Sequence, residues 1–211
     1  MCPCRRGRVD VVSGFDPETL AFYVKEAPVY VSSRPDGEAR YLAAFLDLLP
    51  KGASILELGC GGGRDAEFRI VRGFAVEATD GVPEIASQAA MRLGRPIKIM
   101  QFHELVAEMQ YDAVTASASL LHVPRDALPD ILGRIWRALR PGGHHFATYK
   151  GGGVEGRDEH GRYYNYPDRM NLEKFYLQSG HWADIDIKEY IGGGYFGKQG
   201  PWLRITAQKP Y

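Results

Sequence analysis

Between residues 54 and 150, short apolar runs alternate with segments whose apolar residues recur at helical spacing. The apolar runs predict strands over 54–59, 74–80, 97–102, 111–120 and 144–150. The intervening segments predict helices over 64–72, 83–94 and 125–143. Because strands joined through helices form right-handed crossover units, the pattern predicts a doubly wound α/β fold, a mostly parallel sheet with helices on both faces.

The two ends of the chain depart from this alternation. Prolines at the expected first helical positions predict one helix over 17–26 and a second that begins at Pro35 and ends before Pro50. Near the C-terminus, a helix is predicted over 171–180, and the strands predicted over 183–191 and 202–209 have no helix-length segment between them, which favours an antiparallel pair. We therefore expect one domain overall, with an N-terminal helical cap segment over 1–50 and the α/β sheet over 51–211.

A glycine-rich loop follows the first predicted strand. Four of the five residues 59–63 are glycine, and the loop leads directly into a predicted helix. In an open parallel sheet, ligands bind beyond the carboxyl ends of the strands, and glycines let the main chain approach a ligand closely. A tight turn alone is the other interpretation, but it needs only one or two glycines, so we interpret the loop as a ligand-binding loop.

Two acidic residues indicate what kind of ligand this loop binds. Glu57 lies two residues before Gly59, where a carboxylate disfavours a pyrophosphate and favours an ammonium group. Asp80 closes the next strand, at the position of a ribose-binding acid. The spacing Gly61-x-Gly63-x-x-Ala66 also fits a dinucleotide fingerprint, so a nicotinamide-dependent oxidoreductase remains an alternative. A cofactor-binding module without catalytic activity is a third hypothesis.

Three segments of the chain, "ELGCGGGRDA", "EATDGVPEIASQAA" and "YDAVTASASLLHVPRDALPDILGRIWRALRPGG", resemble the class I S-adenosylmethionine-dependent methyltransferases. The resemblance implies a Rossmann-like sheet of seven strands with the last one antiparallel, and within the family it is most similar to the small bacterial tellurite-resistance-type enzymes. It implies S-adenosylmethionine as the cofactor and a small molecule as the methyl acceptor. The cofactor-binding residues we expect are Glu57, Gly59, Cys60, Gly61, Gly63, Arg64, Asp80, Gly81, Val82, Gln101, Phe102 and Ser117.

Methyl transfer from a sulfonium mainly requires that the acceptor be aligned with the methyl group and that water be excluded. A base is needed only where the acceptor must lose a proton. His122, just beyond the fourth predicted strand, is the candidate base, and a structural histidine that bonds the loop is the alternative. Tyr149, at the end of the fifth predicted strand, is the second catalytic candidate.

The segment 151–168 is rich in glycine, arginine and tyrosine and begins where the fifth predicted strand ends. Loops of this length in compact domains are usually functional or disordered, and we expect a lid over the site. A solvated flap whose tyrosines only pack down is the rival interpretation. The substrate-binding candidates in the lid are Arg157, Tyr163, Tyr164 and Tyr166, with Arg162 beside them.

Charge and cysteine content narrow the expected partners and the expected location. The chain has 26 basic and 26 acidic residues, so its mean field gives no reason to expect a nucleic-acid partner. The sequence contains no apolar run long enough to span a membrane. Cysteines at 2, 4 and 60 cannot build a disulfide framework, which favours a cytoplasmic protein, and we expect Cys2 and Cys4 to lie in a frayed terminus rather than in a metal site.

Overall fold

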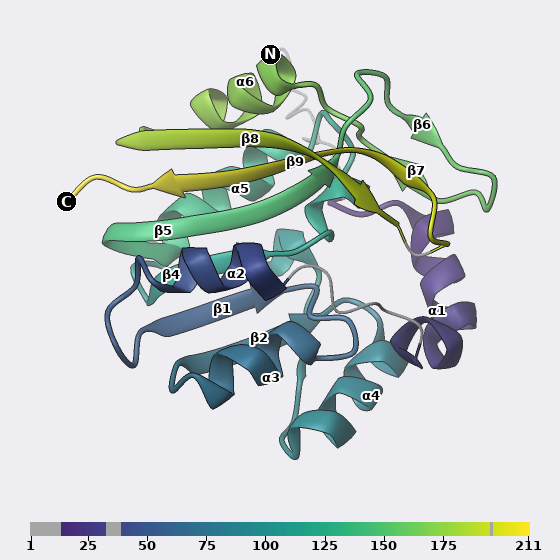
Figure 1. Ribbon diagram of the computed structural model, residues 1–211, viewed down its shortest axis with the longest axis horizontal. Coiled ribbons are helices and arrows are strands. Elements are labelled where there is room, and N and C mark those ends of the chain that lie inside the picture. Colours follow the sequence, from purple (N-terminus) through teal and green to yellow (C-terminus); the bar gives the residue numbers. More distant parts are fainter. Residues whose placement is uncertain (1–13, 33–38, 195) are drawn as a thin grey trace, which may run out of the picture.

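A computed structural model describes residues 14–32, 39–194 and 196–211, and this part of the chain is built around a seven-stranded sheet (Figure 1). The strands are β1 (Ser54–Leu58), β2 (Ala75–Asp80), β3 (Lys98–Ile99), β4 (Tyr111–Ala116), β5 (Leu139–Lys150), β8 (Asp184–Gly193) and β9 (Gln199–Gln208), in the spatial order β3-β2-β1-β4-β5-β9-β8. Strand β9 is antiparallel to both β5 and β8, and the other pairs are parallel. The predicted fold class is confirmed.

Helices cover both faces of this sheet. They are α1 (Pro17–Ser32), α2 (Ala39–Leu46), α3 (Arg64–Val71), α4 (Pro83–Leu93), α5 (Leu128–Ala138) and α6 (Arg169–Ser179). Figure 1 shows α2 and α3 in front of the sheet and α5 and α6 behind it. Helix α1 lies apart from the sheet and packs on α4 through a cluster of Ala27, Val82 and Ile85.

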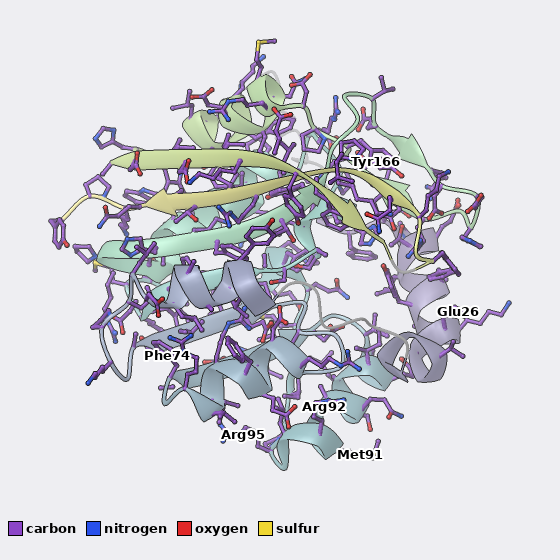
Figure 2. All side chains as sticks on the ribbon, in the orientation of Figure 1. Glu26, Phe74, Met91, Arg92, Arg95 and Tyr166 are labelled. Atoms are coloured by element: carbon purple, nitrogen blue, oxygen red, sulfur yellow. The ribbon has the colours of Figure 1, made fainter. Side chains whose placement is uncertain are left out.

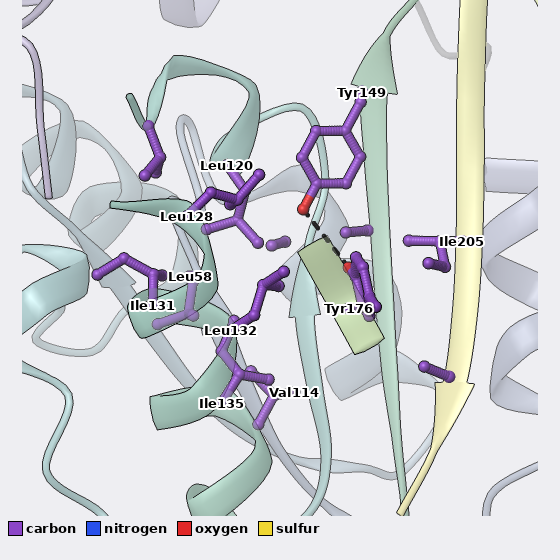
Figure 3. Close-up of a cluster of buried hydrophobic side chains, with 14 of the residues drawn as sticks. Leu58, Val114, Leu120, Leu128, Ile131, Leu132, Ile135, Tyr149, Tyr176 and Ile205 are labelled. Atoms are coloured by element: carbon purple, nitrogen blue, oxygen red, sulfur yellow. Dashed lines mark hydrogen bonds between the residues drawn. The ribbon is translucent and has the colours of Figure 1, made fainter. Parts of the chain in front are cut away.

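The largest core lies between the sheet and the helices α5 and α6. Ile131, Leu132 and Ile135 of α5 are buried against Leu58 of β1 and Val114 of β4 (Figure 3). Full burial of each such side chain contributes about 1.5–3 kcal/mol. This core fixes the height at which the strands end, and therefore the position of the loops that follow β1, β2 and β4.

Several elements differ in length from those that the pattern predicts. The predicted helix 125–143 is too long, because α5 ends at Ala138 and Leu139 already pairs with Tyr111 as the first residue of β5. Gly142, with φ of 74°, suits an extended, bent segment rather than a helix. Conversely, α1 runs past residue 26 to Ser32, since Ala27 gains a packing partner on α4 that the sequence alone does not reveal.

Other elements also differ from the predicted ones. The predicted strand 97–102 is reduced to β3, which is followed by a 3₁₀ turn, η1 (Phe102–Glu104). Helix α6 begins at Arg169 because the Asp168 side chain caps it by accepting a hydrogen bond from the Asn171 N–H. Cys2, Cys4 and the predicted helix start at Pro35 lie outside the described residues. Within the described ranges, no helix has both the length and the apolar character to cross a membrane. The division of the domain at residue 50 remains a prediction.

Candidate functional site

The glycine loop after β1 adopts a backbone that only glycine accommodates without strain. Gly59, Gly61 and Gly63 have φ of 72°, 54° and 79°, all in the left-handed region. A Cβ on Gly59 would lie 2.5 Å from the Cβ of Ser119, in the loop after β4. The loop therefore lies between the ends of β1 and β4, where the strand order reverses and where open α/β sheets bind ligands.

Asp80, the last residue of β2, holds this loop in place. One of its carboxylate oxygens accepts a hydrogen bond from the Gly61 N–H at 2.9 Å, and the other accepts from the Val82 N–H at 2.9 Å. The side chain is buried, so its negative charge lies at the junction of the glycine loop and the start of α4. The structure thus brings Asp80 and the glycines together, as the sequence predicts.

Glu57 has a different surrounding from the one we expected. It is buried in β1 and pairs with the buried guanidinium of Arg69 on α3, with Nη1 and Oε1 2.7 Å apart. Arg69 therefore balances the negative charge of Glu57, for which the sequence suggested the ammonium group of a ligand. The structure gives Glu57 the position of a support beneath the glycine loop.

The remaining expected cofactor residues surround the same edge of the sheet. Gln101 donates to the Gly81 carbonyl at 2.9 Å, and Phe102 lies 3.8 Å from where a Gly59 Cβ would be. Arg64 is the first residue of α3, Val82 packs under α1, and Ser117 is buried just after β4.

The Cys60 side chain packs among Ala66, Ala78 and Ala89, away from the open side of the loop. Burial raises the pKa of its thiol, and the charges of Glu57 and Asp80 raise it further. Its backbone N–H donates to the Thr79 carbonyl at 2.8 Å. Cys60 is therefore a neutral packing residue of the loop in this structure.

The chain bends sharply after β4. Ala118 has φ of 51°, which is unfavourable for a residue with a Cβ, and its N–H donates to the hydroxyl of Thr148 on β5 at 2.8 Å. The next residue, Ser119, donates to the Leu58 carbonyl at 2.7 Å. This bend ends the predicted strand 111–120 early and leads into the 3₁₀ turn η2 (Leu120–His122), which carries His122.

His122 is held between two parts of the chain that are distant in sequence. Its Nδ1 lies 2.6 Å from the Tyr163 carbonyl, which can only accept, so Nδ1 carries the proton. Its Nε2 lies 2.9 Å from the hydroxyl of Tyr23 on α1 and accepts from it in the neutral ring. Burial lowers the pKa of His122 to about 3, and the nearby charges of Arg162 and Lys150 act in the same direction. The histidine is thus a neutral acceptor whose lone pair faces Tyr23.

Tyr149 lies in the core and not at the edge of the sheet. Strand alternation turns it towards α6, where its hydroxyl lies 3.4 Å from that of Tyr176 (Figure 3). Both rings are fully buried, and burial raises the pKa of Tyr149. This placement gives the Tyr149 hydroxyl no route to an acceptor in this structure, so we do not retain the residue as a catalytic candidate.

The predicted lid segment forms a short hairpin of β6 (Gly156–Arg157) and β7 (Tyr163–Tyr164), and α1 holds it. Arg157 pairs with Asp16 at 2.8 Å, and the Tyr163 N–H donates to the Thr19 hydroxyl at 2.8 Å. Tyr163 directs its hydroxyl to Glu155. The hairpin is therefore connected both to α1 and to Asp16, the residue that precedes this helix.

The other two tyrosines of the lid segment stack on each other. The ring centroids of Tyr164 and Tyr166 are 5.0 Å apart, and those of Tyr164 and His122 are 4.5 Å apart. Figure 2 labels Tyr166 beside the end of β9 that lies nearest the hairpin. Of the four lid residues expected to bind substrate, Tyr163 contacts His122 through its backbone carbonyl, and Tyr164 packs its ring against the imidazole.

Arg162 is the buried cation of the hairpin. It donates to the Asp158 carboxylate through Nε and Nη2, at 3.0 and 2.6 Å, and its Nη1 reaches the Tyr23 hydroxyl at 3.3 Å. Among the described residues, four aromatic rings lie within 6 Å of its guanidinium, those of Phe22, Tyr23, Tyr164 and Phe196. Tyr23 therefore connects Arg162 to His122.

A cavity of about 400 Å³ opens between the end of β5, the hairpin and the β8–β9 connection. Lys150, Arg162, Tyr166, Lys198 and Trp202 are among the residues that line it. Neither Lys150 nor Lys198 is among the candidate residues named from the sequence. A second omission is Arg125, which donates to the backbone carbonyls of Gly153, Asn165 and Tyr166 and so anchors the hairpin. Long-range contacts of this kind have no local signal in the sequence.

Comparison with known proteins gives matches to methyltransferases. A family model described as a methyltransferase domain matches residues 30–182. The ubiquinone biosynthesis O-methyltransferase of Xanthomonas oryzae pv. oryzae is 34% identical over 115 residues, which cover 51% of this chain and 46% of that protein. The enzyme of the same description from Xylella fastidiosa is 33% identical over 104 residues, 46% of this chain and 42% of that protein. The chain thus spans less than half the length of the relatives it matches.

Solved structures share the fold. The 1,6-didemethyltoxoflavin-N1-methyltransferase of Burkholderia thailandensis, with bound 1,6-didemethyltoxoflavin and S-adenosylhomocysteine, superposes with a TM-score of 0.73 at 23% identity, covering 92% of this chain and 88% of that one. The phosphoethanolamine N-methyltransferase 2 of Haemonchus contortus, in complex with S-adenosyl-L-methionine, superposes with a TM-score of 0.69 at 18% identity, covering 90% and 57%. At these identities, the likeness establishes the fold alone.

Proposed function

Because this chain belongs to the methyltransferase-domain family, we propose that it transfers a methyl group from S-adenosylmethionine to a small-molecule acceptor. The observation that carries the proposal is the left-handed glycine loop between β1 and β4, braced by the buried carboxylate of Asp80. A Cβ at Gly59 would lie 2.5 Å from the Ser119 Cβ, so the glycine lets the loop pass close to the end of β4, at the edge of the sheet where open α/β folds bind ligands.

We propose the following division of roles at the cofactor site. The backbone of Gly59, Gly61 and Gly63 contacts the methionine portion, and Asp80 accepts from the ribose hydroxyls through the lone pairs that its two backbone bonds leave. Gly81 and Val82 flank the adenine, with Gln101 and Phe102 on the next loop. Glu57 acts beneath the loop through Arg69.

S-adenosylmethionine, when bound, supplies an electrophilic methyl group on a cationic sulfur. The chain then has to orient the acceptor and exclude water, because the leaving group becomes neutral. We propose that α1 and the hairpin do this from above, since Arg157, Tyr163 and Tyr164 attach the hairpin to α1 and η2.

His122 remains our candidate for proton removal, with one addition from the geometry. The hydroxyl of Tyr23 occupies the Nε2 side of the imidazole, so a proton leaving a hydroxyl acceptor passes to His122 through Tyr23. A hydroxyl acceptor is favoured by the O-methyltransferase relatives. The base matters only for an acceptor that is neutral before transfer.

Narrower assignments are proposals from sequence features alone. Membership of the tellurite-resistance type is supported by "GRDA" followed by "GFAVEATDGVPE". A cytoplasmic location and the absence of a nucleic-acid partner are supported by the cysteine content and the balanced charge.

Isothermal titration of the full chain with S-adenosylmethionine and S-adenosylhomocysteine tests the proposed function. We expect both to bind, and we expect NADH not to bind. Heat with NADH and none with either adenosyl compound would instead favour the oxidoreductase hypothesis. Cofactor binding without turnover over a broad panel of acceptors would favour the non-catalytic module.

A further inference from the structure

Lys150, the last residue of β5, projects a half-buried ammonium group into the cavity beside the hairpin. The ammonium lies 4.4 Å from the centroid of the Tyr164 ring. On another side it faces Gly194, where an added Cβ would lie 2.9 Å from the lysine Nζ. Because Gly194 has no side chain, there is space for the Lys150 ammonium beside it.

In the part of the chain that the structure describes, the two arginines of this cavity pair with protein carboxylates and the two lysines do not. Arg162 is bonded to Asp158, and Arg157 is paired with Asp16 and Glu18. Among the residues that the structure describes, no hydrogen bond or ion pair involves the Nζ of Lys150 or of Lys198. Four cationic side chains line the cavity together with the carboxylates of Asp158 and Glu159, and Asp16 and Glu18 balance Arg157 from outside the lining, so the positive charge that no carboxylate of the described residues pairs with is that of the two lysines.

Burial lowers the pKa of Lys150, the charges of Arg162 and Lys198 lower it further, and the charge of Asp158 opposes them. A half-buried ammonium without a paired carboxylate is unfavourable, and a bound anion relieves both the desolvation and the repulsion. The cavity therefore lacks the negative group that its own charges favour.

The cavity is in contact with the proposed site of chemistry. Tyr164 touches the Lys150 ammonium with its ring and packs against His122 at 4.5 Å. Arg162, which also lines the cavity, reaches the Tyr23 hydroxyl that bonds His122. A molecule that enters the cavity therefore lies next to the groups assigned to the acceptor.

We propose that Lys150 binds a carboxylate or phosphate group of the methyl acceptor in this cavity, an inference that rests on the proposed methyltransferase function. The rings of Tyr166 and Trp202 line the same space and give an aromatic acceptor two apolar surfaces. The substrate class is thus a small anionic molecule, with an aromatic acid as the best fit to the lining.

The test uses the full chain saturated with S-adenosylhomocysteine and titrated with benzoate, inorganic phosphate and the neutral analogue benzamide. We expect benzoate to bind about tenfold more tightly than benzamide, since one charge-assisted bond to a buried ammonium is worth that ratio. Stronger binding of phosphate than of benzoate would identify a phosphate acceptor, and the reverse a carboxylate acceptor. Equal affinity for benzoate and benzamide, or no binding of either anion, overturns the proposal.

Variants separate the ammonium from the rest of the cavity. Lys150→Met should lower the affinity for benzoate about tenfold and leave that for benzamide within about twofold. Gly194→Ala, which displaces the ammonium without removing it, should weaken benzoate binding several-fold. The matched control is Lys188→Met, at an exposed lysine of β8 that pairs with Asp186. Unchanged benzoate affinity in both test variants contradicts the assignment.

The cofactor titration distinguishes the two levels of inference. If S-adenosylhomocysteine binds to the wild-type chain and to Lys150→Met but the anions do not bind, only the anion site fails. If S-adenosylhomocysteine does not bind to the wild-type chain, the proposed function itself fails.

Discussion

The two halves of the proposed site are built by different means. On the side of β1 and β2, short-range backbone bonds, small residues and one buried carboxylate shape the glycine loop. On the side of the hairpin, long cationic and aromatic side chains from α1, η2, β7 and the β8–β9 connection meet. The first half is specified within about 25 residues of sequence, and the second depends on contacts across the whole chain. We expect the first half to be rigid and intolerant of substitution, and the second half to tolerate substitution.

Two buried arginines give the strongest test of this contrast. Arg69→Met leaves Glu57 as a buried charge whose side chain is 2% exposed, and we expect the free energy of unfolding to fall by about 3–5 kcal/mol. Arg162→Met should cost less than half as much, because the Asp158 side chain is 15% exposed and the hairpin can hydrate it. Urea denaturation measures both. Equal losses would contradict the proposed difference between the halves, and Glu57→Gln in the Arg69→Met background should recover part of the loss.

Gly59→Ala is expected to have the next largest effect. The new Cβ meets the Cβ of Ser119 at 2.5 Å in a left-handed backbone, so we expect a loss of about 2–3 kcal/mol and loss of cofactor binding. Gly52→Ala is the matched control, with φ of 73° and no atom within 4 Å of the new Cβ. It should cost about 1 kcal/mol and leave cofactor affinity unchanged. Similar losses in the two variants would mean that strain, and not crowding at the site, explains the glycine.

Asp80→Asn should weaken both the loop and cofactor binding. An amide cannot accept from the Gly61 and Val82 N–H groups at the same time, and we expect a loss of about 1.5–3 kcal/mol in cofactor binding, measured by calorimetry. Asp112→Asn is the control, because that carboxylate accepts from the Ser54 N–H at the opposite end of the sheet. The control should lose stability and retain cofactor affinity. Full affinity in Asp80→Asn would place the ribose elsewhere.

The pH dependence of stability tests the hairpin side. The pKa of His122 is lowered to about 3 in the folded chain and is about 6.5 in an unfolded one, so below pH 6.5 the unfolded chain binds a proton that the folded chain does not. The free energy of unfolding should therefore fall as the pH decreases. The contribution of His122 should be less than about 1.4 kcal/mol per pH unit, because the ring is half-buried and solvent screens part of the effect. His122→Gln should fall less steeply than wild type between pH 6.5 and 5, whereas His181→Gln, at an exposed position, should not differ. Identical slopes for His122→Gln and wild type would remove His122 from this effect.

The arrangement of the glycine loop and Asp80 could be predicted from the sequence because its determinants are local. The strand pattern, the glycines and Asp80 all act on their immediate neighbours, and the structure brings them together at one edge of the sheet. Glu57 shows the limit of this reasoning, since its partner Arg69 is a helix residue whose direction the sequence pattern does not give. An acid beside a glycine loop therefore indicates a charge but not the group that balances it.

The acceptor half could not be predicted to the same depth. The hydrogen bond between Tyr23 and His122 joins residues 99 positions apart, and no local sequence pattern predicts it. On β5, alternation places His145, Ala147 and Tyr149 on one face, but both faces of this strand are covered, so the sequence does not show which side of the sheet Tyr149 faces. Burial lowers the pKa of His145 to about 4, so this core histidine is neutral.

Helix α1 contacts both halves of the proposed site. Its Ala27 packs against Val82, at the expected adenine position, while its Thr19 and Tyr23, with Asp16 just before the helix, hold the hairpin and His122. A ligand that displaced this one helix would therefore move residues of both proposed sites together.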